Sequence, residues 1–266
     1  MRLTLTGISL AAWHLLSMSL PESAHVKPAS QPNWASVGQR AVPIAVLGVG
    51  IAALGWAGAS SGTLLSGAVL ACVFLLGADA LAALKKQTLG WASRVTQARL
   101  ALVAVLVAAL LEPAVYRDAG WMVAGVALLA LSLDGVDGFL ARRLEECSNF
   151  GARFDMEVDA ALILVLCLGA AVTGLAGAWV LLLGLMRYLF LLAGQTLTWL
   201  RFPLPPSFRR KLVCVWQVGA LVVAISPLAT GLGAELILLS ALAGLVYSFA
   251  VDVLWLYNNR RLSYSQ

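Results

Sequence analysis

The stretch that decides the fold reads DGVDGFLARRLEECSNFGARFDMEVD, from Asp134 to Asp159. It joins two apolar spans, at 120–141 and 154–173. Each span is about as long as a helix needs to be to cross a bilayer, which takes about 20 apolar residues. The stretch therefore predicts two membrane helices that meet at a polar loop, with acidic residues on both helices close to that loop.

The whole chain has the composition of a helical membrane protein. Of its 266 residues, 61% are apolar and only 12% are charged, whereas a soluble domain carries about 25% charged residues. The apolar residues form continuous runs, and a transmembrane barrel would instead need short alternating segments. We expect an all-α, polytopic transmembrane helical bundle with about eight spans, at 41–58, 63–84, 98–115, 120–141, 154–173, 177–198, 211–227 and 232–256.

Three regions follow one another along the chain. Residues 1–40 are expected to be a partly disordered N-terminal segment and linker, the linker running from Pro21 to Ser36. Residues 3–20 resemble a signal peptide faintly, and an interfacial helix or a start-site artefact fits them equally well. Two extra transmembrane helices are expected in 41–89, and the main bundle in 90–266.

Basic residues are distributed unequally between the two ends of the predicted spans. The short connections 58–62, 116–119, 174–176 and 227–231 carry one basic residue, Arg117, while the other ends carry most of the others. Because basic loops stay on the cytoplasmic side, both termini and the acidic stretch are predicted to be cytoplasmic, in a bacterial inner membrane. This distribution explains the net charge of +5 without nucleic acid, and the four cysteines have neither zinc-site nor disulfide spacing.

The aspartates of the opening stretch have helical spacing. Asp134 and Asp137 are three residues apart and Asp155 and Asp159 four, so each pair shares one helix face. Acidic residues in membrane spans are costly and mark functional sites by default. Four facing carboxylates would repel one another unless divalent cations joined them, and oxygen ligands suit Mg²⁺ or Mn²⁺, with Ca²⁺ also possible. Pairing with neighbouring arginines or capping of helix ends is the purely structural alternative.

The same stretch carries a family resemblance. The pattern D-x2-D-G-x2-A-R-x8-G-x3-D-x3-D resembles the signature of the CDP-alcohol phosphatidyltransferases (class I). Its fixed positions are Asp134, Asp137, Gly138, Ala141, Arg142, Gly151, Asp155 and Asp159. The likeness extends over about 90–258, where Thr96 and Arg99 resemble the family's T-x2-R element and Arg187 its intramembrane arginine. Arg210 stands where a glycine often precedes the family's lysine, here Lys211.

The resemblance implies an activity and a role for each of these residues. The reaction moves a phosphatidyl group from CDP-diacylglycerol to an alcohol and releases CMP. The metal ligands would be Asp134, Asp137, Asp155 and Asp159, holding two Mg²⁺ or Mn²⁺ ions, with Asp159 also the catalytic base. The CDP-binding residues would be Thr96, Gly138, Ala141, Arg142 and Gly151. The acceptor or its phosphate would contact Arg187, Arg209, Arg210 and Lys211, and the chain would form a homodimer among membrane lipids.

Several alternatives stay open at this point. A transporter or ion-pathway protein could use the aspartates, although that reading does not explain the glycines and Arg142 of the motif. An inactive family member could serve as a scaffold, although the motif is intact. The acceptor could be glycerol 3-phosphate, inositol phosphate, serine or a simpler alcohol. Arg187 is expected to pair with a motif aspartate or a substrate phosphate. Asp79 is expected to pair with Lys85 or to snorkel to the membrane surface, and not to take part in catalysis.

Overall fold

The fold is built from helices joined mostly by short turns. The computed structural model describes residues 33–84, 90–144, 149–202, 204–205, 207–229 and 231–259, and these contain no strand. The α-helices are α2 (Asn33–Trp56), α3 (Ser61–Leu84), α4 (Trp91–Ala109), α5 (Pro113–Asp118), α6 (Gly120–Arg143), α7 (Asn149–Val172), α8 (Leu181–Thr196), α9 (Phe208–Ile225) and α10 (Leu232–Asn259). Two short 3₁₀ helices are η1 (Ala178–Val180) and η2 (Thr198–Arg201). The all-α class is confirmed.

Among the residues that the structure describes, four helical segments are long and apolar enough to cross a membrane. They are α3, α4, α10 and the segment Ala178–Thr196, which contains α8. Shorter apolar helices lie at Ala41–Trp56 and Gly120–Val136. The predicted spans fall mainly on these helices, so the polytopic helical bundle is confirmed, while the count of eight spans stays a prediction.

Two predicted boundaries differ from the structure. The span expected at 98–115 is a helix from Trp91 to Ala109, and a separate helix begins at Pro113. Buried polar residues on α4 continue the helix ahead of the apolar run, and Pro113 stands at a first helical turn, where a missing N–H costs nothing. Helix α2 begins at Asn33, inside the predicted linker, so the helix continues ahead of the apolar run into the polar residues before it.

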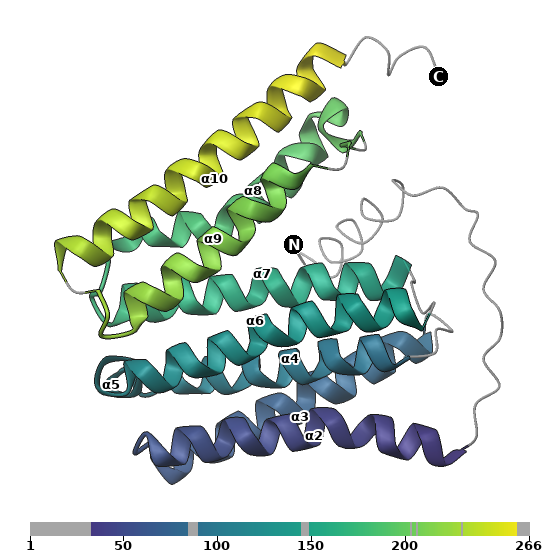
Figure 1. The fold of residues 1–266 in the computed structure, drawn as a ribbon, viewed down its shortest axis with the longest axis vertical. Coiled ribbons are helices and arrows are strands. Elements are labelled where there is room, and N and C mark those ends of the chain that lie inside the picture. The colour runs from purple at the N-terminus through teal and green to yellow at the C-terminus, as the bar shows by residue number, and fades with distance from the viewer. Residues whose placement is uncertain are drawn as a thin grey trace, which may run out of the picture.

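Helix α4 lies at the centre of the arrangement. In Figure 1 the α2–α3 pair lies on one side of α4 and the α6–α7 pair on the other, with α8, α9 and α10 beyond α7. Most of α4 is buried, and its Leu102 and Leu106 share one apolar core with Ala127, Leu166 and Leu221. The helices on the outside, α3 and α10, carry many exposed large apolar side chains, as lipid contact requires.

The connections divide the bundle into two ends. One end holds the turns after α2, α4, α7 and α9, which are mostly apolar and contain one basic residue, Arg117. The other end holds the first turns of α4, α7 and α9 and the last turns of α6, α8 and α10 (Figure 1). The second end collects the polar side chains described next.

Candidate metal and substrate site

Three aspartates meet at the second end of the bundle. Asp134 lies in the last three turns of α6, and Asp155 and Asp159 lie in the first three turns of α7. A short connection joins these antiparallel helices, so the stripe on each helix faces the other. One carboxylate oxygen from each aspartate lies within 4.8 Å of the other two. The predicted convergence of the two stripes is therefore correct for these three residues.

Arg99 of α4 holds these carboxylates from the buried side. Its Nη1 lies 3.1 Å from Asp134 Oδ1 and also donates to Asp155 Oδ1, and its Nη2 donates to Asp159 Oδ1. The Arg99 side chain is 1% exposed, whereas those of the three aspartates are 37%, 32% and 33% exposed. We call these four residues the carboxylate cluster; Arg99 forms its floor and the aspartates its open face.

The carboxylate cluster has the charge and the donor set for a divalent cation. Among its described side chains, three formal negative charges face one positive charge, which leaves two negative charges uncompensated. All the ligand atoms are carboxylate oxygens, which Mg²⁺ and Mn²⁺ prefer. The aspartates therefore fit the metal site that the sequence predicts, and the number of ions stays a prediction.

Several other predicted site residues belong to the same end. The side chains of Asp137, Ala141 and Arg142 lie outside the described residues, although their backbone belongs to α6. Gly138 and Gly151 are half-buried on α6 and α7. Thr96 is buried on α4, and its hydroxyl donates to the carbonyl of Ala92 at 3.3 Å. Their assignment to CDP binding stays a prediction.

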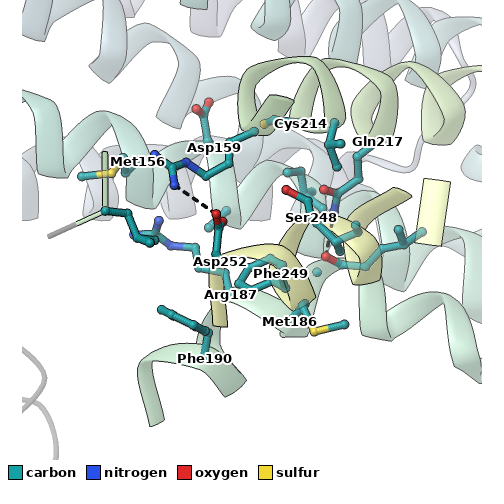
Figure 2. A pocket seen from close by; sticks show the side chains of 18 residues that line it. Met156, Asp159, Met186, Arg187, Phe190, Cys214, Gln217, Ser248, Phe249 and Asp252 are labelled. Carbon is teal, nitrogen blue, oxygen red and sulfur yellow. Dashed lines mark hydrogen bonds and ion pairs between the residues drawn. The ribbon is translucent and has the colours of Figure 1, made fainter. Parts of the chain in front are cut away.

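A pocket lies next to the carboxylate cluster, between α7, α8, α9 and α10. Its volume is about 310 Å³ and its lining is mostly apolar. Asp159 and Asp252 line it from α7 and α10, as Figure 2 shows, and Arg187 and Arg210 add positive charge. Asp159 therefore belongs both to the carboxylate cluster and to the pocket wall.

Arg187 has a different partner from the one predicted. Its Nη2 donates to Glu157 Oε1 at 2.7 Å, so the ion pair joins α8 to α7. Glu157 lies between Asp155 and Asp159 in sequence, which turns it to another face of α7, towards α8. The prediction that a motif aspartate pairs with Arg187 is therefore wrong, because Glu157, which is not part of the motif, forms the ion pair. Arg187 still lines the pocket.

The basic residues at the start of α9 divide into two groups. Arg209 and Arg210 both donate to Asp252 Oδ1, at 2.5 Å and 3.3 Å. Arg209 also donates to the carbonyl of Ser248 and Arg210 to that of Pro205. We call Arg209, Arg210 and Asp252 the α9–α10 cluster. Lys211 is exposed, and of the three basic residues only Arg210 lines the pocket.

Two acidic residues that form ion pairs were not expected from the sequence. Glu157 and Asp252 were passed over, although an acid inside the last apolar span meets the rule for intramembrane charges. The prediction that Asp79 of α3 pairs with Lys85 stays a prediction, because Lys85 lies outside the described residues. Asp79 Oδ1 accepts from Arg94 Nη1 at 2.8 Å and from Gln97 Nε2 at 3.0 Å.

The fold and the cluster define a helical membrane protein whose acidic cluster could hold a cation and lies beside a mostly apolar pocket. The family model described as CDP-alcohol phosphatidyltransferase matches residues 89–251, more than half of the chain. The chain therefore belongs to the CDP-alcohol phosphatidyltransferase family, whose members transfer phosphatidyl groups in phospholipid synthesis. Searches of curated proteins and of solved structures found no match to the chain.

Proposed function

We propose that the chain transfers the phosphatidyl group of CDP-diacylglycerol to the hydroxyl of an alcohol acceptor and releases CMP, with Mg²⁺ or Mn²⁺ at the carboxylate cluster. The observation that carries this proposal is the double position of Asp159, which lies in the cluster and also lines the pocket. A cation on the cluster and an acceptor in the pocket would then meet at one side chain.

The reaction is a displacement at phosphorus. The acceptor oxygen forms a bond to the phosphorus that carries diacylglycerol, and the bond from that phosphorus to the CMP oxygen breaks. CMP leaves with the electron pair, and the acceptor hydroxyl loses its proton. Two divalent ions, when bound, would supply charge neutralisation at the diphosphate.

Asp159 is the residue proposed to take the proton. General bases must lie within hydrogen-bond reach of the proton, and Asp159 is the member of the carboxylate cluster that lines the pocket. Asp134, Asp137 and Asp155 are proposed as the further metal ligands. Arg99 keeps the described carboxylates in place from below, as preorganised sites require.

Substrate-binding roles follow from position and charge. We assign the CDP moiety to Thr96, Gly138, Ala141, Arg142 and Gly151, at the ends of α4, α6 and α7. Arg187 and Arg210 line the pocket and would contact a phosphate on the acceptor, if it carries one. Arg209 is directed to α10 and Lys211 is exposed, so their proposed role is attraction of anionic substrates.

The location of the site is part of the proposal. Most basic residues with a described position lie at the same end of the bundle as the cluster. By the positive-inside rule that end is cytoplasmic, which places both termini on the cytoplasmic side of a bacterial inner membrane. We further propose a homodimer.

The test uses purified full-length protein in detergent with CDP-diacylglycerol, Mg²⁺ or Mn²⁺, and a panel of alcohols. The panel contains glycerol 3-phosphate, inositol phosphate, serine and simple alcohols. We expect CMP release with one of them, abolished by a chelator and in Asp155→Asn. Asp118→Asn makes the same chemical change at the exposed end of α5 and should keep full activity. If no acceptor gives CMP release above the Asp155→Asn level, the proposal fails.

A further inference from the structure

The two helices ahead of the family match, α2 and α3, are packed tightly against α4. Ala71 of α3 is buried with Ala101 and Ala104 of α4. A Cβ at Gly67 would lie 3.3 Å from the Cβ of Ala108, and one at Gly50 would lie 3.1 Å from a methyl group of Val105. Such close approach between backbones is the usual basis of helix association in membranes. The hairpin is therefore integral to the bundle.

A polar contact joins α3 to α4 at the end that holds the carboxylate cluster. Asp79 Oδ1 accepts from Arg94 and from Gln97, and Arg94 Nη1 also donates to Gln97 Oε1 at 2.6 Å. Arg94 and Gln97 are 8% and 1% exposed, whereas the Asp79 side chain is 36% exposed, so the contact is buried on the side of α4 and partly open on the side of α3. Hydrogen bonds of a buried charged group are strong and directional. Asp79 thus fixes the first turns of α4 against α3.

The same turns of α4 carry Arg99 on another face. Successive residues of an α-helix are rotated by about 100° around its axis. Arg99 is therefore rotated by about 200° from Gln97 and by about 140° from Arg94, which puts it on a different face. The contacts agree with this geometry, because Gln97 meets α3 while Arg99 meets α6 and α7. A rotation of the first turns of α4 would move both contacts at once.

We infer that Asp79 is a positioning residue: by holding Arg94 and Gln97, it sets the rotation of α4 that places Arg99 under the carboxylate cluster. This gives the α2–α3 hairpin a role at the site although it lies ahead of the family match. The inference rests on the proposed function for its catalytic consequence, but its structural consequence concerns the metal ligands alone.

The chain offers a matched control for Asp79. Glu112, in the turn before α5, also ties the hairpin to the rest of the bundle, accepting from the Ser60 N–H and the Thr63 hydroxyl at 2.9 Å each. These contacts lie at the opposite end of the bundle. Glu112→Gln therefore weakens the docking of the same hairpin without touching the turns that carry Arg99.

The experiment measures binding of Mn²⁺ alone by electron paramagnetic resonance, in purified full-length protein. Asp79→Asn should weaken Mn²⁺ binding about tenfold, the lower end of the range for residues that orient metal ligands. Asp79→Glu, which keeps the carboxylate, should restore part of this loss, and Glu112→Gln should bind as the wild type does. With an active acceptor, Asp79→Asn should lower kcat more than it raises the acceptor KM.

Two outcomes overturn the inference: wild-type Mn²⁺ binding in folded Asp79→Asn, or an equal loss in Glu112→Gln. If Asp79→Asn does not fold, Gln97→Leu takes its place, since it keeps the Asp79–Arg94 ion pair. It should weaken Mn²⁺ binding in the same direction, and an unchanged binding curve contradicts the inference. Absence of CMP release in the wild type would contradict the proposed function. The Mn²⁺ affinities of the wild type and the variants could still be compared, because that assay does not depend on catalysis.

Discussion

The carboxylate cluster and the α9–α10 cluster are opposites in charge. In the first, one arginine serves three carboxylates, and the arginine is the buried member at 1% exposure. In the second, one carboxylate serves two arginines, and the carboxylate is the buried member, with 11% exposure against 24% and 31% for Arg209 and Arg210. In each cluster the single residue of one sign is buried beneath the two or three residues of the opposite sign, which are more exposed.

The pocket between the two clusters receives a charge of opposite sign from each of them. Asp159 brings the negative excess of one cluster to the pocket, and Arg210 brings the positive excess of the other. A negative excess attracts metal ions, and a positive excess attracts phosphate groups. We therefore expect the side of the pocket with Asp159 to take part in the reaction and the side with Arg210 to bind the substrate. The following substitutions test this division.

The largest effect is expected from neutralising Asp159. Asp159→Asn removes the proposed base, so kcat for CMP release should fall by about 10²–10⁴-fold. Asp252→Asn makes the same change on the opposite wall of the pocket, where it should cost about tenfold at most and act mainly on acceptor KM. Equal losses of kcat in the two variants, measured with saturating acceptor, would remove the distinction between the walls.

The next effect concerns the floor of the carboxylate cluster. Arg99→Leu leaves three neighbouring carboxylates without their buried partner, at a cost of about 3–5 kcal/mol. The thermal midpoint in detergent with EDTA should fall by about 10 °C. Mg²⁺ should restore much of this loss, because it supplies positive charge at the same carboxylates.

Arg117→Leu provides the control for that experiment. Arg117 is exposed at the far end of the bundle, so its loss should leave the midpoint unchanged with EDTA or with Mg²⁺. A midpoint of Arg99→Leu that does not respond to Mg²⁺ would argue against cation binding at the cluster.

A smaller effect is expected at the positive wall. Arg210→Gln removes a pocket charge while Arg209 still pairs with Asp252. If the acceptor carries a phosphate, its KM should rise about tenfold with kcat nearly unchanged, since a lost hydrogen bond to a charged group costs about 1.5–3 kcal/mol. A fall in kcat with a constant KM would instead indicate that Arg210 acts in the reaction step and not in acceptor binding.

The smallest effect is expected far from both clusters, at Glu112. The Ser60 N–H and then the Thr63 hydroxyl lower the pKa of Glu112. A lowered pKa means that the contribution to stability is complete above the ordinary carboxyl pKa and is lost as pH falls through the lowered value. The thermal midpoint of Glu112→Gln should be slightly below wild type at pH 7 and equal to it in acid. A gap that widens towards low pH would contradict this assignment.

The sequence predicts the fold class and the centre of the carboxylate cluster well, because both depend on local patterns. Apolar runs of membrane length identify helices, and helical spacing places Asp155 and Asp159 on one face. The α6–α7 connection then brings Asp134 to them, since a short loop forces neighbouring antiparallel helices.

The ion-pair partners could not be predicted in the same way. Arg99 reaches the aspartates from α4, and Asp252 reaches Arg209 from α10, so both contacts depend on how distant helices pack. Glu157 pairs with Arg187 only because α8 lies against that face of α7. Spacing within one helix gives no information on such contacts. It is only the cost of an unpaired charge inside the membrane that indicates, from the sequence, that each of these residues has a partner.

The central claim is that the carboxylate cluster binds divalent cations, and Mn²⁺ binding tests it most directly. Wild type, Asp155→Asn and Asp118→Asn would be titrated with Mn²⁺ in detergent and bound ion measured by electron paramagnetic resonance. We expect saturable binding in the wild type and in Asp118→Asn, and strongly weakened binding in Asp155→Asn. If Asp155→Asn bound Mn²⁺ as tightly as the wild type does, the claim that the carboxylate cluster binds divalent cations would be contradicted.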